Sequence, residues 1–225
     1  MIRFVAAFIL AGLSLGLSTQ ASAQTEQQTL VDRATLTVQE MLGDKDATDS
    51  RNLLRRAKGV LVCPQIFKAG FIFGGQGGSC VMSGHTAKGW TSPAFYGLGA
   101  GSIGLQAGIQ DSQVIFIVLT EKGLQALLDS QFKLGADASV AIATIGIGIQ
   151  GSTTAALNAD IVAFAQTRGL FAGVSIDGSL ISTKSDWNQL YYGKPMGAQQ
   201  LVISNEGANP GADPLREMLA RFSAN

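Results

Sequence analysis

The sequence is poor in the side chains that most often carry chemistry. It contains one histidine and two cysteines, and only 14% of its residues are charged. With so few imidazole and thiolate ligands, we expect no dedicated zinc or haem site and no cofactor. Sixteen basic residues balance sixteen acidic residues, whereas nucleic-acid binding needs a clustered excess of Lys and Arg. The composition therefore disfavours metalloenzymes and nucleic-acid-binding proteins.

The single histidine, His85, is the only candidate for a catalytic histidine base. It lies in a predicted turn downstream of Cys80, and Asp111 is a conceivable carboxylate to orient it. Nucleophilic catalysis needs a nucleophile and a base within hydrogen-bonding reach, and nothing else in the sequence supports such a pair. We therefore interpret His85 as a solvated turn residue and expect a protein that is not an enzyme.

Glycine, in contrast, is abundant, with 28 residues. Residues 99–104 and 146–151 both match the glycine spacing of a dinucleotide-binding fingerprint. That fingerprint works only where a helix N-terminus follows a strand, and neither segment is followed by a helical pattern. We interpret both segments as bends in a sheet, because Gly lets a strand bend or another backbone approach closely.

The N-terminus has the pattern of a secretory signal peptide. Arg3 supplies the positive start, residues 4–17 form an apolar run, and Ala-Ser-Ala at 21–23 has the small-x-small pattern of a cleavage site. We expect cleavage before Gln24. The competing interpretation, a retained membrane anchor, is disfavoured because the apolar run is short for a membrane span.

Removal of residues 1–23 leaves residues 24–225 as a single exported domain. No Cys follows the apolar run, so a lipoprotein anchor has no attachment point. We expect a periplasmic product that is soluble or peripherally attached to a membrane.

Hydrophobic spacing predicts helices near both ends of this domain, one helix inserted midway, and short strands between them. The predicted helices cover residues 26–44, 50–57, 121–130, 185–193 and 213–222. Ser185 or Asp186 is expected to cap the fourth of these, and Pro214 to stand at the first position of the last. The strands do not alternate with helices as in a parallel α/β protein. The pattern predicts an α+β fold with a large antiparallel sheet, strongly curved or barrel-like.

The sequence leaves undecided whether the two cysteines, Cys63 and Cys80, form a disulfide. An oxidising compartment permits a bridge. If residues 58–66, 68–75 and 78–84 form a three-strand meander, the first and third strands lie roughly 10 Å apart, too far for a bridge. A bridge needs these strands to be neighbours, or a bend at Pro64.

The predicted helix over residues 26–44 is amphipathic, and its apolar face has two interpretations. The face packs on the sheet, which is the default in a globular domain, or it lies in a membrane surface. The apolar face comprises Leu30, Val31, Ala34, Val38, Met41 and Leu42. The charges of this helix are net acidic, which disfavours electrostatic docking on anionic lipid.

A cationic cluster follows this helix. It comprises Arg51, Arg55, Arg56, Lys58 and Lys68. Such a cluster could bind lipid phosphates through charge-assisted hydrogen bonds. The alternative is a solvated helix face with compensating acids.

An ordered series of sequence blocks resembles one known family. RGLFAGVSIDGS at 168–179 closely resembles the signature of the SYLF domain. Further blocks follow the family's order, namely AKGVLVCPQIFKAGF at 57–71, GGSCVMSG at 77–84, residues 89–110, residues 133–143 and NQLYYG at 188–193. The resemblance covers roughly residues 30–200.

The resemblance implies lipid binding. Eukaryotic SYLF relatives bind phosphoinositides through an N-terminal amphipathic segment and a basic surface, and fungal members also bind actin. Carried over to this chain, the apolar helix face and the cationic cluster defined above would form the lipid site. The resemblance thus predicts a non-catalytic lipid- or phospholipid-binding protein of the cell envelope, acting at a membrane surface or holding an apolar ligand inside the sheet. The alternative is a structural or protein-interaction module of the envelope without a lipid ligand.

Overall fold

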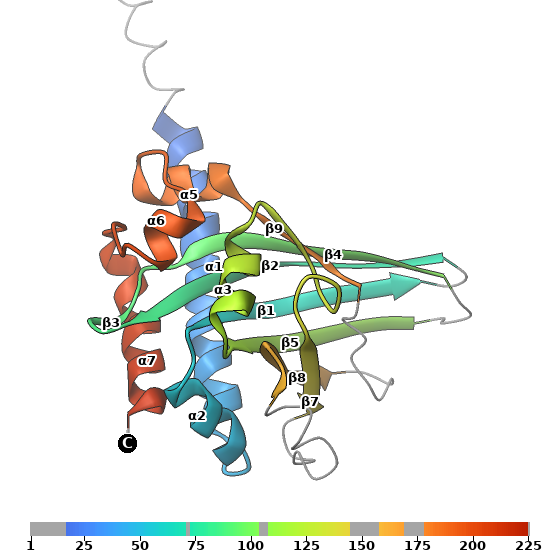
Figure 1. Ribbon diagram of the computed structural model, residues 1–225. Coiled ribbons are helices and arrows are strands. Elements are labelled where there is room, and N and C mark those ends of the chain that lie inside the picture. Colours follow the sequence, from blue (N-terminus) through green and yellow to red (C-terminus); the bar gives the residue numbers. More distant parts are fainter. Residues whose placement is uncertain (1–16, 71–72, 104–107, 145–157, 169–177, 225) are drawn as a thin grey trace, which may run out of the picture.

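Helices pack against both faces of a large curled sheet, which forms a half-barrel (Figure 1). The computed structural model describes residues 17–70, 73–103, 108–144, 158–168 and 178–224. The first sixteen residues of the predicted signal peptide, the glycine-rich segment 146–151 and most of the signature at 168–179 lie outside these ranges.

The elements follow one another in an α+β order. They are α1 (Leu17–Gly43), α2 (Thr48–Arg55), β1 (Gly59–Gly70), β2 (Phe73–Thr86), β3 (Gly89–Trp90), β4 (Ala94–Ile103), β5 (Gly108–Val118), α3 (Glu121–Leu128), β6 (Gln131–Lys133), β7 (Val140–Thr144), β8 (Ile161–Arg168), β9 (Leu180–Thr183), α5 (Ser185–Tyr192), α6 (Ala198–Val202), the 3₁₀ turn η1 (Pro210–Ala212) and α7 (Asp213–Ser223). No helix in the described part of the chain is both long and apolar enough to cross a bilayer.

The sheet confirms the predicted architecture. Its strand order is β6-β9-β4-β2-β1-β5-β8-β7, with β3 pairing only with β2. Neighbouring strands are antiparallel, except that β7 and β8 run parallel. The segment 99–104, one of the two fingerprint-like segments, lies in β4 over its described residues and pairs with β2. Its interpretation as part of a sheet is thereby confirmed.

Strand alternation divides the core into two layers. Val60 and Val62 of β1 belong to a cluster that packs under α1, α2, α5 and α7. Leu61 and Cys63 belong to a second cluster, which α3 and α6 cover on the opposite face. Successive strand side chains point to opposite faces, so these strands are buried on both sides. Packed side chains therefore occupy both faces in the described part, where the sequence had allowed an enclosed apolar ligand.

The predicted helices are confirmed, with one difference in capping. Pro214 stands in the first turn of α7, and the side chain of Thr120 caps α3 by accepting from Gly123 N. Ser185, however, is already the first residue of α5, so Lys184 occupies the N-cap position and no side chain caps the helix. The short helix α6 was not predicted, because five residues carry too little periodicity to be recognised.

Candidate binding groove

A β-bulge in β1 changes which side chains face α1. The register of β1 against both β2 and β5 shifts around Pro64. Before the shift, Val62 faces the α1 side; after it, Ile66 joins the opposite core cluster, and Gln65 and Phe67 face α1. Proline removes a ladder donor and is tolerated in a central strand only at such a bulge. The bulge thus aims a polar and an aromatic side chain at α1.

A disulfide lies beside this bulge and answers the open question about the cysteines. Cys63 and Cys80 are bonded and fully buried, with Cα atoms 4.2 Å apart. The three-strand premise was wrong, because residues 68–75 are not a strand of their own. They contain the end of β1 and the start of β2, so the two cysteines lie on neighbouring strands.

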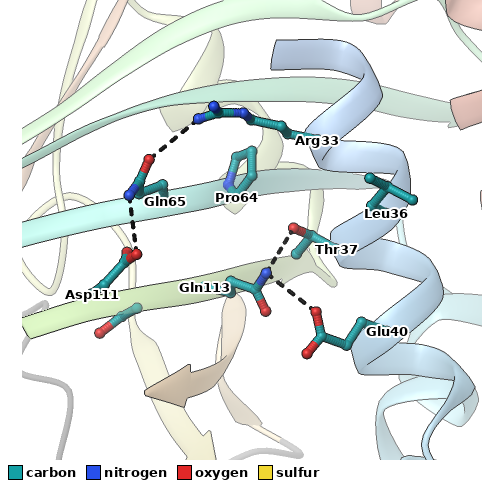
Figure 2. A pocket seen from close by; sticks show the side chains of 9 residues that line it. Arg33, Leu36, Thr37, Glu40, Pro64, Gln65, Asp111 and Gln113 are labelled. Carbon is teal, nitrogen blue, oxygen red and sulfur yellow. Dashed lines mark hydrogen bonds between the residues drawn. The ribbon is translucent and has the colours of Figure 1, made fainter. Parts of the chain in front are cut away.

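Two adjoining cavities form one surface groove between α1 and the sheet, called the α1 groove below. Their volumes are about 230 Å³ and 280 Å³, and they share Arg33, Pro64 and Gln65. The first is also lined by Leu36, Thr37, Glu40, Asp111, Ser112 and Gln113, as Figure 2 shows. The second is also lined by Glu26, Thr29, Leu30, Phe67, Gly77, Gly78, Ser79 and Trp187. The wall therefore comes from α1, with Trp187 of α5 at one end, and the floor comes from β5, β1 and β2.

Long hydrogen bonds connect the wall of the α1 groove to its floor. Arg33 donates to Gln65 Oε1 at 3.3 Å, and the Gln65 amide donates to Asp111 Oδ2 at 3.0 Å (Figure 2). The Gln113 amide donates to Thr37 Oγ1 and to Glu40 Oε2, each at 3.4 Å. The bonds of 3.3 Å and 3.4 Å to α1 are weak, whereas the 3.0 Å bond between Gln65 and Asp111 has ordinary length. A partner's polar groups could exchange for the weak bonds at little cost.

Two acceptors in the groove lining lack a donor among the described residues. They are Asp111 Oδ1 and Gln113 Oε1, and both atoms are enclosed by neighbouring side chains. An enclosed acceptor without a donor carries a desolvation cost. Both acceptors are therefore buried without a donor from the described part of the chain, and they are not exposed on the surface of the α1 groove.

Exposed apolar side chains flank the α1 groove. Leu36 on α1 is 63% exposed and Phe67 on β1 is 48% exposed. At the end near β2, Lys184 Nζ lies 3.8 Å from the centre of the Trp187 ring and donates to Ser79 Oγ at 2.8 Å. Burial lowers the pKa of Lys184, against the opposing effect of the Glu26 carboxylate. The groove thus combines apolar, amide and charged surface.

The predicted apolar helix face lies in the core, and of its residues only Leu30 also lines the α1 groove. Leu30, Val31, Ala34, Val38, Met41 and Leu42 are all at most 9% exposed and belong to the cluster between α1 and the sheet. Because the sheet and α7 cover them, they cannot contact a bilayer in this structure. This corrects their assignment to a lipid surface and agrees with the alternative that the face packs on the sheet.

The five predicted cations do not form one surface. Arg51 donates to the carbonyls of Leu42 and Asp44, each at 2.8 Å, and so satisfies the C-terminal end of α1. Arg55 and Arg56 are exposed, with Arg55 bonded to Asn52, and Lys58 pairs with Glu121 at 3.0 Å.

Lys68 lies well away from the other four cations. It stands near the far end of β1, ten positions along the chain from Lys58, which corresponds to roughly 30 Å along a strand. The single cationic cluster of the sequence therefore divides into a structural arginine, a surface group and a distant lysine.

The histidine is more tightly held than a solvated turn residue. His85 lies in β2, where its ring stacks on Trp90 with centroids 4.3 Å apart, and its Nδ1 lies 3.1 Å from the Ala57 carbonyl. Cys80 cannot act as its nucleophile, because the disulfide occupies its sulfur. Among the described residues, no group of His, Cys, Asp and Glu side chains is arranged to hold a metal ion.

Sequence reasoning missed most of the α1 groove. Arg33, Gln65 and Gln113 were assigned no role, and Asp111 only a conceivable one beside His85. The available signal was Pro64 within an otherwise strand-like run, because proline there indicates a bulge, and bulges re-aim the side chains that follow.

Comparisons with known proteins agree on one family. The sequence profile of the family described as "Las17-binding protein actin regulator" matches residues 99–222. LAS seventeen-binding protein 3 of Saccharomyces cerevisiae is 30% identical over 178 residues, which are 77% of this chain and 39% of the yeast protein. Protein YSC84 of the same yeast is 28% identical over 177 residues, 77% of this chain and 38% of its own.

A human relative extends the same pattern. SH3 domain-containing YSC84-like protein 1 of Homo sapiens is 26% identical over 174 residues, which are 76% of this chain and 51% of the human protein. The chain therefore spans about two fifths to one half of the length of these relatives. The family description refers to binding and regulation and the name of LAS seventeen-binding protein 3 to binding, and neither names a reaction.

Proposed function

Because the chain belongs to the Ysc84 family, the SYLF domain family that its sequence blocks resemble, we propose that it is a non-catalytic module that binds a protein partner through the α1 groove. The observation that carries the proposal is the groove itself. It exposes Leu36 and Phe67 beside a lining of amide and charged groups. The family description and the name of LAS seventeen-binding protein 3 support a binding role in general, since both describe binding proteins.

A protein surface suits this groove better than a small molecule or a lipid chain. Protein interfaces combine an apolar centre with a polar rim, and Arg and aromatic residues are enriched in them. Arg33, Phe67 and Trp187 supply such groups here. The two cavities lie in an open surface groove, whereas a drug-sized ligand usually has most of its surface enclosed by its site. A polar lining is also a poor surface for an acyl chain.

Site-specific photo-cross-linking tests the proposal directly. A photoreactive phenylalanine analogue replaces Leu36 in the full chain, produced in the organism that encodes it. Ile203 and Leu190, exposed at 39% and 40% on or next to other helices, serve as matched control positions. We expect a discrete protein adduct from position 36 that neither control position gives. The same adducts from all three positions, or no protein adduct from position 36, would overturn the proposal.

Lipid binding remains a prediction from the family resemblance, and the exposed pair Arg55 and Arg56 favours it. Flotation of the full chain with zwitterionic and anionic vesicles tests it. Salt-sensitive flotation only with anionic vesicles, abolished by Arg55→Glu/Arg56→Glu, would support a headgroup site on this pair. Absence of flotation with either vesicle would refute it and leave the protein-binding proposal standing.

We also propose that the protein is exported to the cell envelope. The signal-like pattern of residues 1–23 and the Cys63–Cys80 disulfide support this, because disulfides persist in oxidising compartments. Helix α1 begins at Leu17, but Gln27 is its first described side chain that is buried. Cleavage before Gln24 would thus leave the packed part of α1 intact. The intact mass of the protein recovered from the periplasm tests this; a chain that retains residues 1–23 would contradict it.

A further inference from the structure

Two cations flank the larger cavity of the α1 groove, called the Phe67 cavity below. Arg33 lines this cavity and is exposed, and its one hydrogen bond among the described residues is the 3.3 Å contact with Gln65. Lys184 lies beside the cavity, because its Nζ contacts two lining side chains, the Ser79 hydroxyl and the Trp187 ring. In the described part of the chain, no ion pair involves either cation.

The hydroxyl of Ser79 adds a hydrogen-bond donor to the lining of the Phe67 cavity. A serine hydroxyl has one O–H donor and two acceptor lone pairs. Ser79 Oγ accepts from Lys184 Nζ at 2.8 Å, and no acceptor for its own proton lies among the described residues. The ammonium group therefore leaves the Ser79 O–H to donate, and it places a positive charge behind that donor.

One carboxylate, Glu26, opposes the two cations. It lines the Phe67 cavity, and its charge acts on Lys184 from beyond ion-pairing distance. Two positive charges and one negative charge leave a net formal charge of +1 around the cavity. A single carboxylate neutralises this charge, whereas a phosphate monoester, which carries about −1.5 to −2 at neutral pH, would exceed it. The charge balance therefore favours a carboxylate.

Beyond the cavity, the sheet carries no side chain between two exposed apolar residues. The strand registers pair Phe67 with Gly77, Gly77 with Gly99, and Gly99 with Leu180. Directly paired residues of neighbouring strands share one face of a sheet. Phe67 is 48% exposed and Leu180 is 42% exposed, and they stand three strand spacings apart, roughly 14 Å along the sheet. The backbone between them, at Gly77 and Gly99, is called the glycine floor below.

Packing within the described part of the fold does not require these two glycines. Neither has a positive φ, and a Cβ would make only an ordinary contact, at 3.5 Å for Gly77 and 4.0 Å for Gly99. Glycine in a strand interior costs stability relative to a residue with a side chain. It also permits another chain to approach the backbone closely. The glycine floor is thus suited to contact with a partner.

From this arrangement we propose that the Phe67 cavity binds an acidic side chain, Asp or Glu, of the protein partner. Its carboxylate accepts from the Arg33 guanidinium and from the Ser79 hydroxyl, and charge-assisted bonds of this kind are the strong ones. A neighbouring apolar side chain of the partner packs on Phe67 and over the glycine floor, where it removes apolar surface from water. This inference rests on the proposed protein-binding function and specifies the chemistry of the partner.

Cross-linking from the cavity itself tests the proposal. A photoreactive phenylalanine analogue replaces Phe67 in the full chain, produced in the organism that encodes it. Arg33→Glu and Lys184→Gln are each added to this chain. Lys194→Glu, which changes an exposed lysine outside both cavities, is the matched control. We expect each cavity variant to reduce the yield of the protein adduct about threefold to tenfold, and the control to leave it unchanged.

A further variant tests the glycine floor. Gly99→Val places a side chain on the floor between Gly77 and Leu180. Valine favours strands more than glycine does, so the midpoint of urea unfolding should stay unchanged or rise. The yield of the adduct should nevertheless fall about threefold or more, because the partner's apolar side chain loses its place. An unchanged yield would refute packing on the glycine floor.

Sequencing of the cross-linked partner peptide completes the test. We expect an Asp or Glu beside an apolar residue near the attachment point, and replacement of that acid by Lys should restore the adduct to Arg33→Glu. An adduct whose yield ignores both Arg33→Glu and Lys184→Gln would refute the acidic occupant while the protein-binding function stands. A protein adduct from position 36 without one from position 67, or a lipid adduct from position 67, would also refute it. No protein adduct from either position would refute both proposals.

Discussion

The same Leu→Ala substitution should lower the free energy of unfolding by very different amounts on the two sides of α1. Leu42 is fully buried in the core between α1 and the sheet, whereas Leu36 is 63% exposed at the α1 groove. Leu→Ala removes three carbon atoms, and each buried carbon contributes about 0.8 kcal/mol of transfer free energy. The cavity left behind adds to this loss. We therefore expect Leu42→Ala to lower the free energy of unfolding by about 3 kcal/mol, and Leu36→Ala to change it by less than about 0.5 kcal/mol.

Urea unfolding followed by far-UV circular dichroism measures both values on the full chain. Alanine is a strong helix former, so propensity contributes little to either difference. A loss below about 1 kcal/mol for Leu42→Ala would contradict the burial of this face and return it to the candidates for a membrane surface. A loss for Leu36→Ala comparable to that of Leu42→Ala would show that Leu36 is packed, and would remove it from the α1 groove.

Three further predictions use matched residues or conditions. Gly78→Ala should cost about 2–4 kcal/mol of unfolding free energy, because a Cβ there would overlap the backbone carbonyl of Gln65 at the β1 bulge. In the same urea assay, Gly77→Ala should cost less than about 0.5 kcal/mol, because its Cβ would make only an ordinary contact at 3.5 Å. Arg51→Ala should cost about 1–2 kcal/mol because it leaves the carbonyls of Leu42 and Asp44, at and just beyond the end of α1, without their charged donor. Arg55→Ala should be nearly neutral, and equal costs would refute the capping role of Arg51. Hydrogen bonds, the strongest from the Thr120 hydroxyl, lower the pKa of Asp160 to about 2. A carboxyl whose folded pKa is below its unfolded value stabilises the fold above pH 4, so this stability should be lost between about pH 4 and pH 2. Asp160→Asn should remove about 1–2 kcal/mol of that dependence in a pH series of thermal unfolding.

The general architecture followed from patterns that act locally. Helices α1 and α7 were predictable because their apolar residues recur at helical spacing over ten or more residues. The strands were predictable as elements because short β-branched and aromatic runs end at glycine and proline. Their alternation did not reveal which residues face α1, however, because both sheet faces are buried and both therefore carry apolar side chains.

The groove depends on long-range pairing that no local pattern carries. The bulge at Pro64 inverts the facing of Gln65 and Phe67, and this inversion exists only relative to the registers of β2 and β5. From the sequence, Arg51 is indistinguishable from the neighbouring surface cations. Only the structure places the carbonyls of Leu42 and Asp44, near the end of α1, within hydrogen-bonding distance of it. The sequence of the apolar face of α1 is equally compatible with packing in a protein core and with lying in a membrane surface, because both environments favour the same apolar residues.

Stability and recognition therefore share the β1 bulge and the helix α1, but among the α1 side chains only Leu30 belongs to both the described core cluster and the groove lining. On α1, the residues that pack into the core alternate with exposed residues that line the groove, such as Arg33, Leu36 and Glu40, so a substitution of these can change binding while the core is preserved. The bulge is different, since Pro64, Gly78 and the neighbouring Cys63–Cys80 bridge set the strand approach on which the groove floor depends. A change there alters the fold and the groove together. Variants of the exposed α1 residues that line the groove are consequently the ones that can separate loss of binding from loss of folding.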